Sequence, residues 1–130
     1  MVAFVVISLA DCKKSGVALS SGLIGKWELH ERYGGNIYPP DTLYKPGNGN
    51  MLQFNADSTY KSYANGMLIH SGIFHTRNHF SYSATAIRQD ELYFDNDTSF
   101  RYVIQINANI LLMKPIMPDI ATTDYEKISN

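Results

Sequence analysis

The sequence has little cysteine, no excess of charge of either sign and no long hydrophobic run. Its 130 residues contain one Cys and no Cys/His spacing typical of a zinc site, so neither an internal disulfide nor a structural metal is expected. Eleven Lys and Arg residues stand against twelve Asp and Glu residues, which excludes the basic excess that phosphate binding requires and makes nucleic acid an unexpected partner. The abundant residues are apolar ones, at 45%, including nine Tyr and six Phe, and they favour a single globular domain rich in strands.

The N-terminal apolar segment is too short to cross a membrane as a helix. Residues 1–10 read MVAFVVISLA, about half of the roughly 20 residues that a spanning helix requires. The length is typical of the apolar region of a secretory signal. The segment ends in Leu-Ala-Asp-Cys at residues 9–12 and is followed by KKSGVALSSG at residues 13–22, a small and polar stretch that predicts a flexible tether.

This order resembles the lipobox of bacterial lipoproteins, in which the Cys is lipid-modified and becomes the mature N-terminus. The resemblance implies a signal segment over residues 1–12, lipidation of Cys12 and a location in the bacterial cell envelope, facing the periplasm or the cell surface. The attached acyl chains would hold the domain on a membrane. The alternative is that residues 2–9 form an ordinary strand and that Cys12 packs as a small apolar side chain.

From residue 23 onward, apolar and polar residues alternate with a period of two, and no window keeps a helical period. In residues 25–33 the alternation places Trp27, Leu29, Glu31 and Tyr33 on the inward face, and Lys26, Glu28, His30 and Arg32 on the outward face. Asn65-Gly66 is typical of a two-residue hairpin turn, and Gly72 within the next strand predicts a bulge or a bend. The predicted strands are 25–33, 51–55, 59–64, 67–74, 80–85, 91–95, 99–106, 110–114 and 124–128.

Short strands at this spacing, with no crossover helix between them, predict an all-β fold: a small up-and-down antiparallel barrel of about eight strands. Four segments carry a family resemblance. LIGKW at residues 23–27 resembles the GxW opening of lipocalins, and FNADSTY at 54–60 is similar to the F-x-x-D-G-T-Y hairpin of short bacterial lipocalin-like domains, with Ser58 in place of Gly. SGIF at 71–74 and YEKI at 125–128 resemble further strands of these calycin-type domains. The resemblance implies that residues 23–130 form one lipocalin-like barrel, with Trp27 closing one end.

Residues able to carry chemistry are few. The four histidines are expected on the surface, because His70 and His75 have opposite strand parity unless a bulge at Gly72 resets it, and no metal site is expected. Glu31 is the one acid on an apolar face and would become a general acid if burial raised its pKa. The alternative is that Glu31 reaches solvent or pairs with Arg32 or Arg101. Without a base, a nucleophile and an orienting group together, neither an enzyme nor a cofactor is expected.

A barrel of about eight strands has room for its own side chains or for one small ligand. The leading hypothesis is a membrane-anchored, lipocalin-like binding protein for a small apolar or amphipathic molecule. The alternative is a filled barrel that acts as a structural or protein-interaction module, with an envelope protein as partner. Residues 34–50 lack periodicity and are predicted to fold over the barrel mouth as a lid, or else to form a loop ordered by tyrosine packing alone. The predicted ligand-binding residues are Leu29, Leu52, Phe54, Tyr60, Phe74, Tyr102 and Ile104, with Tyr38 and Tyr44 at the mouth.

Overall fold

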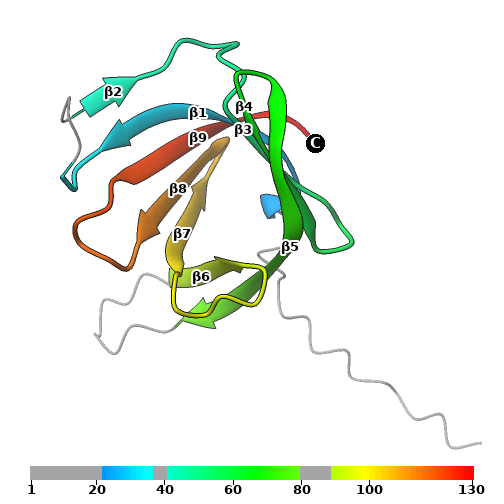
Figure 1. The fold of residues 1–130 in the computed structure, drawn as a ribbon, viewed down its shortest axis with the longest axis vertical. Coiled ribbons are helices and arrows are strands. Elements are labelled where there is room, and N and C mark those ends of the chain that lie inside the picture. Colours follow the sequence, from blue (N-terminus) through cyan, green and yellow to red (C-terminus); the bar gives the residue numbers. More distant parts are fainter. Residues whose placement is uncertain (1–21, 37–40, 80–88) are drawn as a thin grey trace, which may run out of the picture.

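The computed structural model describes residues 22–36, 41–79 and 89–130, and the side chains of residues 78, 79 and 89 are left out of the description. Helical backbone in the described part is confined to Gly22 and Leu23, so the all-β prediction is confirmed (Figure 1). The strands are β1 Gly25–Tyr33, β2 Asp41–Leu43, β3 Met51–Phe54, β4 Thr59–Ala64, β5 Met67–His79, β6 Gln89–Phe94, β7 Tyr102–Asn107, β8 Ile110–Pro115 and β9 Thr122–Ser129.

Eight of these strands close into an antiparallel barrel. β1 and β3 to β9 pair in chain order, and β9 returns to pair with β1 from Lys26↔Ser129 to Tyr33↔Thr122. The predicted up-and-down barrel is therefore confirmed, and closure removes the free sheet edges that would otherwise invite aggregation. β2 lies outside the ring: β1 pairs with β3 along its first half and with β2 along its second half, where Glu31 faces Leu43.

Most strand boundaries follow the sequence prediction, with three exceptions. β1 and β4 have the predicted limits, whereas β2 falls inside residues 34–50, where no regular structure was predicted. Pairing with the exposed edge of β1, rather than any local propensity, accounts for β2. β7 begins at Tyr102 instead of residue 99, because the Asp97 carboxylate accepts the Ser99 N–H at 3.0 Å and forms a turn there. β5 runs on to His79, and the predicted strand 80–85 lies outside the described residues.

The hairpin turns use the backbone conformations that their residues tolerate. Asn65 and Gly66 have φ of 50° and 80°, which confirms the two-residue turn between β4 and β5. Ser58 has φ of 67°, so this serine adopts the left-handed conformation at the position where the F-x-x-D-G-T-Y pattern has glycine. The turn chemistry therefore sets the register of these hairpins.

A β-bulge in β1 reverses the predicted facing of the strand's second half. Leu29 pairs with Tyr125 and Glu31 pairs with Asp124, so His30 is an extra residue on β1. Trp27 and Leu29 face inward as predicted. Beyond His30, Arg32 turns toward the barrel interior, while the Tyr33 hydroxyl donates to the outward Asp124 carboxylate at 3.5 Å. The predictions of an outward Arg32 and of an inward Glu31 and Tyr33 are thus wrong, because an added residue shifts the two-residue alternation.

The bulge predicted at Gly72 is also misplaced. Gly72 pairs with Tyr60 in regular register, and the bulge in β5 falls three residues earlier, at Ile69. Gly72 serves a different purpose, since a Cβ atom there would collide with the Asp95 carboxylate and lie 3.0 Å from Cε1 of Tyr60. The missing side chain therefore leaves room for these two groups to meet above β5.

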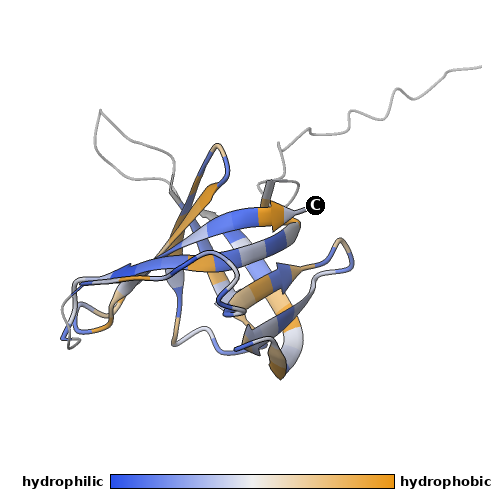
Figure 2. Ribbon diagram, turned by 90° about the horizontal axis from the view of Figure 1, so that it is seen from above, coloured by the Kyte–Doolittle hydropathy of each residue, from blue (hydrophilic) through white to orange (hydrophobic). Residues whose placement is uncertain are grey.

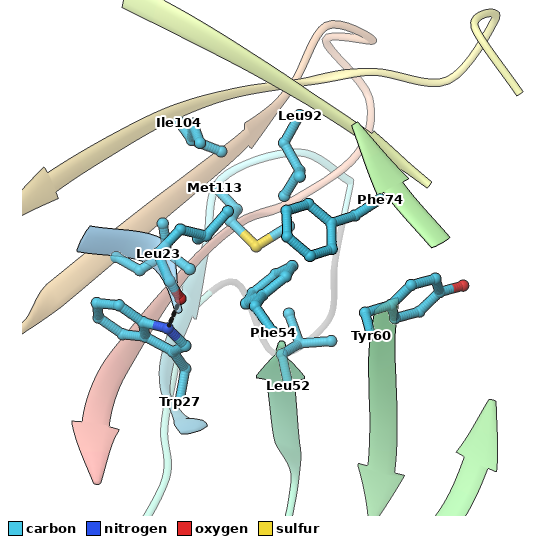
Figure 3. Close-up of a cluster of buried hydrophobic side chains, with 10 residues drawn as sticks. Leu23, Trp27, Leu52, Phe54, Tyr60, Phe74, Leu92, Ile104 and Met113 are labelled. Atoms are coloured by element: carbon cyan, nitrogen blue, oxygen red, sulfur yellow. Dashed lines mark hydrogen bonds between the residues drawn. The ribbon is translucent and has the colours of Figure 1, made fainter. Parts of the chain in front are cut away.

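One end of the barrel is filled by its own side chains (Figure 3). Trp27 is fully buried, and its indole N–H donates to the Leu23 carbonyl at 2.8 Å, which confirms the inward prediction for Trp27. Phe54 and Phe74 meet edge to face with centroids 5.1 Å apart. Figure 2 shows hydrophobic and hydrophilic residues alternating along the strands around this core. The fully buried apolar side chains are Leu23, Trp27, Phe54, Leu92, Ile104 and Leu111.

Candidate ligand-binding cavity

The other end of the barrel holds an open cavity of about 450 Å³. All eight strands of the ring contribute to its wall, together with the loop between β8 and β9. The lining combines apolar and aromatic surface with a few polar groups, as ligand cavities do. The lining residues are Leu29, Arg32, Leu52, Tyr60, Ser62, His70, Phe94, Tyr102, Met113, Pro115, Ile120, Ala121, Thr123 and Tyr125.

The structure divides the predicted ligand-binding residues into separate groups. Four of the nine line the cavity: Leu29, Leu52, Tyr60 and Tyr102. Three others, although inward as predicted, are buried in the filled half and do not reach it: Phe54, Phe74 and Ile104. Inward facing alone does not distinguish a residue that touches another side chain from one that borders open space.

Of the two predicted mouth residues, Tyr44 does not border this cavity. Tyr44 lines a separate hollow of about 260 Å³ beside Glu28 and Lys127, against the outer side of β1 and β9. Its backbone N–H donates to the His30 carbonyl at 2.9 Å, which ties the segment after β2 to the barrel wall. Tyr38 lies outside the described residues. Residues 41–44 therefore pair with β1, and no described residue of 34–50 lines the cavity.

Several lining residues were not predicted, for different reasons. Ser62 lies two residues after Tyr60 on β4, and Phe94 lies two residues after Leu92 on β6, so the period-two alternation could have indicated both. Arg32 could not be found in this way because the His30 bulge changes its facing. His70 is exposed, as predicted for the histidines, but it is exposed at the cavity mouth opposite Ser62.

A hydrogen-bonded cluster joins β4, β5 and the loop after β6 at the edge of the cavity. The Tyr60 hydroxyl donates to Asp95 Oδ2 at 3.2 Å, His70 Nε2 lies 3.4 Å from the same oxygen, and the Ile73 N–H donates to Oδ1 at 3.2 Å. The Ile73 N–H is the largest cause that lowers the pKa of Asp95, so this carboxyl stays ionised. Figure 3 shows the Tyr60 hydroxyl pointing away from the buried cluster, toward this group.

The phenols of the wall remain neutral hydrogen-bond donors at physiological pH. Burial, together with the neighbouring Asp95 charge, raises the pKa of Tyr60 to about 12. Burial also raises the pKa of Tyr125 to about 12, against the opposing effects of Thr123 and of the Arg32 charge, and raises the pKa of Tyr102. A phenol that stays protonated can orient a ligand without adding a negative charge to the cavity.

Arg32 is the permanent charge of the cavity wall. Its exposed side chain lies at the mouth, close enough to Tyr125 to influence that phenol. None of the described residues lining the cavity is an acid. Within the described ranges, the guanidinium group of Arg32 takes part in no hydrogen bond or salt bridge.

The other candidate residues lie elsewhere. His75 stacks on Tyr93 with ring centroids 4.7 Å apart, and His79 lacks a described side chain. Glu31 does not border the cavity. Arg101 pairs with Glu91, its guanidinium lying 3.5 Å from the Glu91 carboxylate, and not with Glu31. Among the residues that the structure describes, no three His, Cys, Asp or Glu side chains gather as a metal site would require. The same part of the chain contains no helix with the length and apolar character needed to span a membrane.

Comparison of the chain with protein-family models, with curated proteins and with solved structures finds no match.

Proposed function

We propose that this chain is a lipocalin-like binding protein that holds a small apolar or amphipathic molecule inside its barrel. The observation that carries the proposal is the cavity of about 450 Å³, which falls within the roughly 300–1,000 Å³ of small-molecule sites. Its wall supplies apolar contact through Leu52, Phe94 and Met113 and hydroxyl donors through Tyr102 and Tyr125. Such a combination suits a ligand that is largely apolar with a few polar atoms.

The competing function is a filled barrel that serves as a structural or protein-interaction module of the cell envelope. Side chains fill the half of the barrel around Trp27, but the other half holds the cavity. The presence of this space favours a binding protein over the filled-barrel alternative. We assign the barrel no catalytic role. The Asp95 carboxylate that faces His70 also accepts hydrogen bonds from the Tyr60 hydroxyl and the Ile73 N–H, an arrangement typical of a structural link between strands.

We further propose that the domain is lipid-anchored through Cys12 at a membrane of the bacterial cell envelope. The support for the anchor is the order of residues 9–12 and the apolar segment before it. The support for lipocalin-like family membership is the GxW opening at residues 25–27. Its Trp27 indole is buried in the core at one end of the barrel and donates to the Leu23 carbonyl.

Titration of the purified chain with the uncharged fluorophore N-phenylnaphthylamine tests the binding function. We expect saturable binding. A ligand concentration of a hundred times Kd adds about 2.7 kcal/mol to the free energy of unfolding, so the melting temperature should rise. Ser62→Phe places a bulky ring in the cavity and should weaken binding by about ten-fold or more. Ser71→Phe is the matched control, since Ser71 is exposed on the adjacent strand and does not line the cavity.

Two results would overturn this function. One is the absence of saturable binding by N-phenylnaphthylamine, dodecanol and dodecanoate alike. The other is equal binding by the Ser62→Phe and Ser71→Phe variants, which would place the probe outside the barrel. Either result would return attention to the interaction module, with residues 41–50 as the first surface to mutate.

A further inference from the structure

Among the described residues, the cavity wall carries a positive charge without a negative one. Arg32 brings a permanent positive charge to the wall, and no acid is among the described residues that line it. The nearby acid, Asp95, is already bound by the Tyr60 hydroxyl, the Ile73 N–H and the His70 imidazole. The cavity therefore offers a ligand a cationic group that has no carboxylate partner among the described residues.

The position of this cation follows from the backbone and not from a flexible side chain alone. Without the extra residue His30, alternation along β1 would turn Arg32 toward the outside of the barrel and Tyr33 toward the inside. The bulge instead places Arg32 opposite Thr123 on β9, and both residues line the cavity. Bulges often re-aim a side chain beside a binding site.

The cavity wall combines hydrogen-bond donors with apolar surface. A guanidinium group presents a planar fork of N–H donors that matches a carboxylate. The neighbouring Tyr125 hydroxyl, held neutral by burial, adds a further donor. Leu52 and Met113 are buried deeper in the wall and offer apolar contact.

We propose that Arg32 binds the anionic head group of a single-chain amphipath, with a long-chain carboxylate as the simplest case, while the alkyl chain occupies the apolar part of the cavity. This inference rests on the proposed binding function and names the ligand class for the same cavity. A neutral head group would leave Arg32 hydrated at the mouth, and a cationic head group would be repelled.

Displacement of bound N-phenylnaphthylamine from the full chain measures the head-group preference. Three competitors share one alkyl chain: dodecanoate, dodecanol and dodecyltrimethylammonium. We expect dodecanoate to bind most tightly and the cation most weakly. Arg32→Gln should lower dodecanoate affinity by about ten-fold, as loss of a charge-assisted hydrogen bond does, and leave dodecanol within about two-fold of its original value. Raising the ionic strength should weaken only the dodecanoate complex.

Two variants keep this result interpretable. Lys61→Gln removes an exposed cation of β4 that does not line the cavity, so it should leave dodecanoate binding unchanged. Arg32→Lys keeps the charge without the planar fork and should retain part of the preference.

Equal affinity for dodecanoate and dodecanol in the unmodified chain, or an equal loss of both in Arg32→Gln with the melting temperature preserved, would overturn the head-group role while leaving the cavity as a binding site. Failure of all three competitors and of the fluorophore to bind would instead overturn the proposed function itself.

Discussion

Replacing Trp27 tests whether the filled half of the barrel holds the fold together. The indole is fully buried and bonded to the Leu23 carbonyl at 2.8 Å, and the Lys127 ammonium lies 5.3 Å from its ring centroid. Trp27→Ala leaves a cavity that neighbouring strands of a closed barrel cannot readily fill, and such truncations cost about 3–5 kcal/mol. We expect a loss at the upper end of this range, because the Leu23 carbonyl also loses its donor.

Trp27→Phe separates the two contributions. The phenyl ring keeps most of the buried apolar surface but cannot donate to the Leu23 carbonyl, and an unpaired buried acceptor costs about 1–3 kcal/mol. The smaller ring adds a modest packing loss. The difference between the two variants therefore estimates the packing contribution of the indole.

Urea unfolding followed by far-UV circular dichroism gives the free energies, because the chain contains one Trp and its fluorescence is lost in both variants. Leu43→Ala is a suitable control, since this side chain is 73% exposed on β2 outside the ring, and its removal should change stability by no more than about 0.5 kcal/mol. A Trp27→Ala variant that loses less than about 1 kcal/mol would refute the reasoning, since it would mean that the indole is not part of a close-packed core.

Two further predictions concern other parts of the chain. Gly72→Ala should destabilise the barrel by about 1–3 kcal/mol, because the added methyl displaces the Asp95 carboxylate and crowds Tyr60; Ser71→Ala is the control, and equal melting temperatures for the two variants would contradict this account. Cys12→Ser should abolish incorporation of radiolabelled palmitate and release the protein from the membrane fraction, whereas a wholly soluble unmodified protein with an intact Met1 by mass spectrometry would contradict the anchor.

The sequence predicts the barrel well because its signals are local. Alternation with a period of two identifies β1 and β4 with their observed limits, and Asn65-Gly66 identifies the hairpin after β4. These features depend on side-chain parity and on backbone conformations that particular residues tolerate, both of which are readable from neighbouring residues.

The cavity is less predictable because it depends on residues distant in the sequence. Leu52 and Phe54 lie on the same inward face of β3, yet only Leu52 borders the cavity, whereas Phe54 meets Phe74 and Phe94. Which of them borders open space is set by the stagger of strands around the ring and by the side chains opposite. The Asp95 cluster likewise joins three separate elements, none of which carries a motif for it.

The bulge at His30 gives the clearest physical reason to treat the cavity mouth as a site of function. Regular alternation would place the Tyr33 ring inside the barrel, where an aromatic side chain could fill space and add packing energy. The bulge replaces it with Arg32, whose guanidinium forms no ion pair in the described part of the chain. An exposed cation without an ion-pair partner adds little to the stability of a fold. Its placement on the cavity wall therefore fits the anion-binding role that we propose for Arg32 better than a role in the stability of the fold.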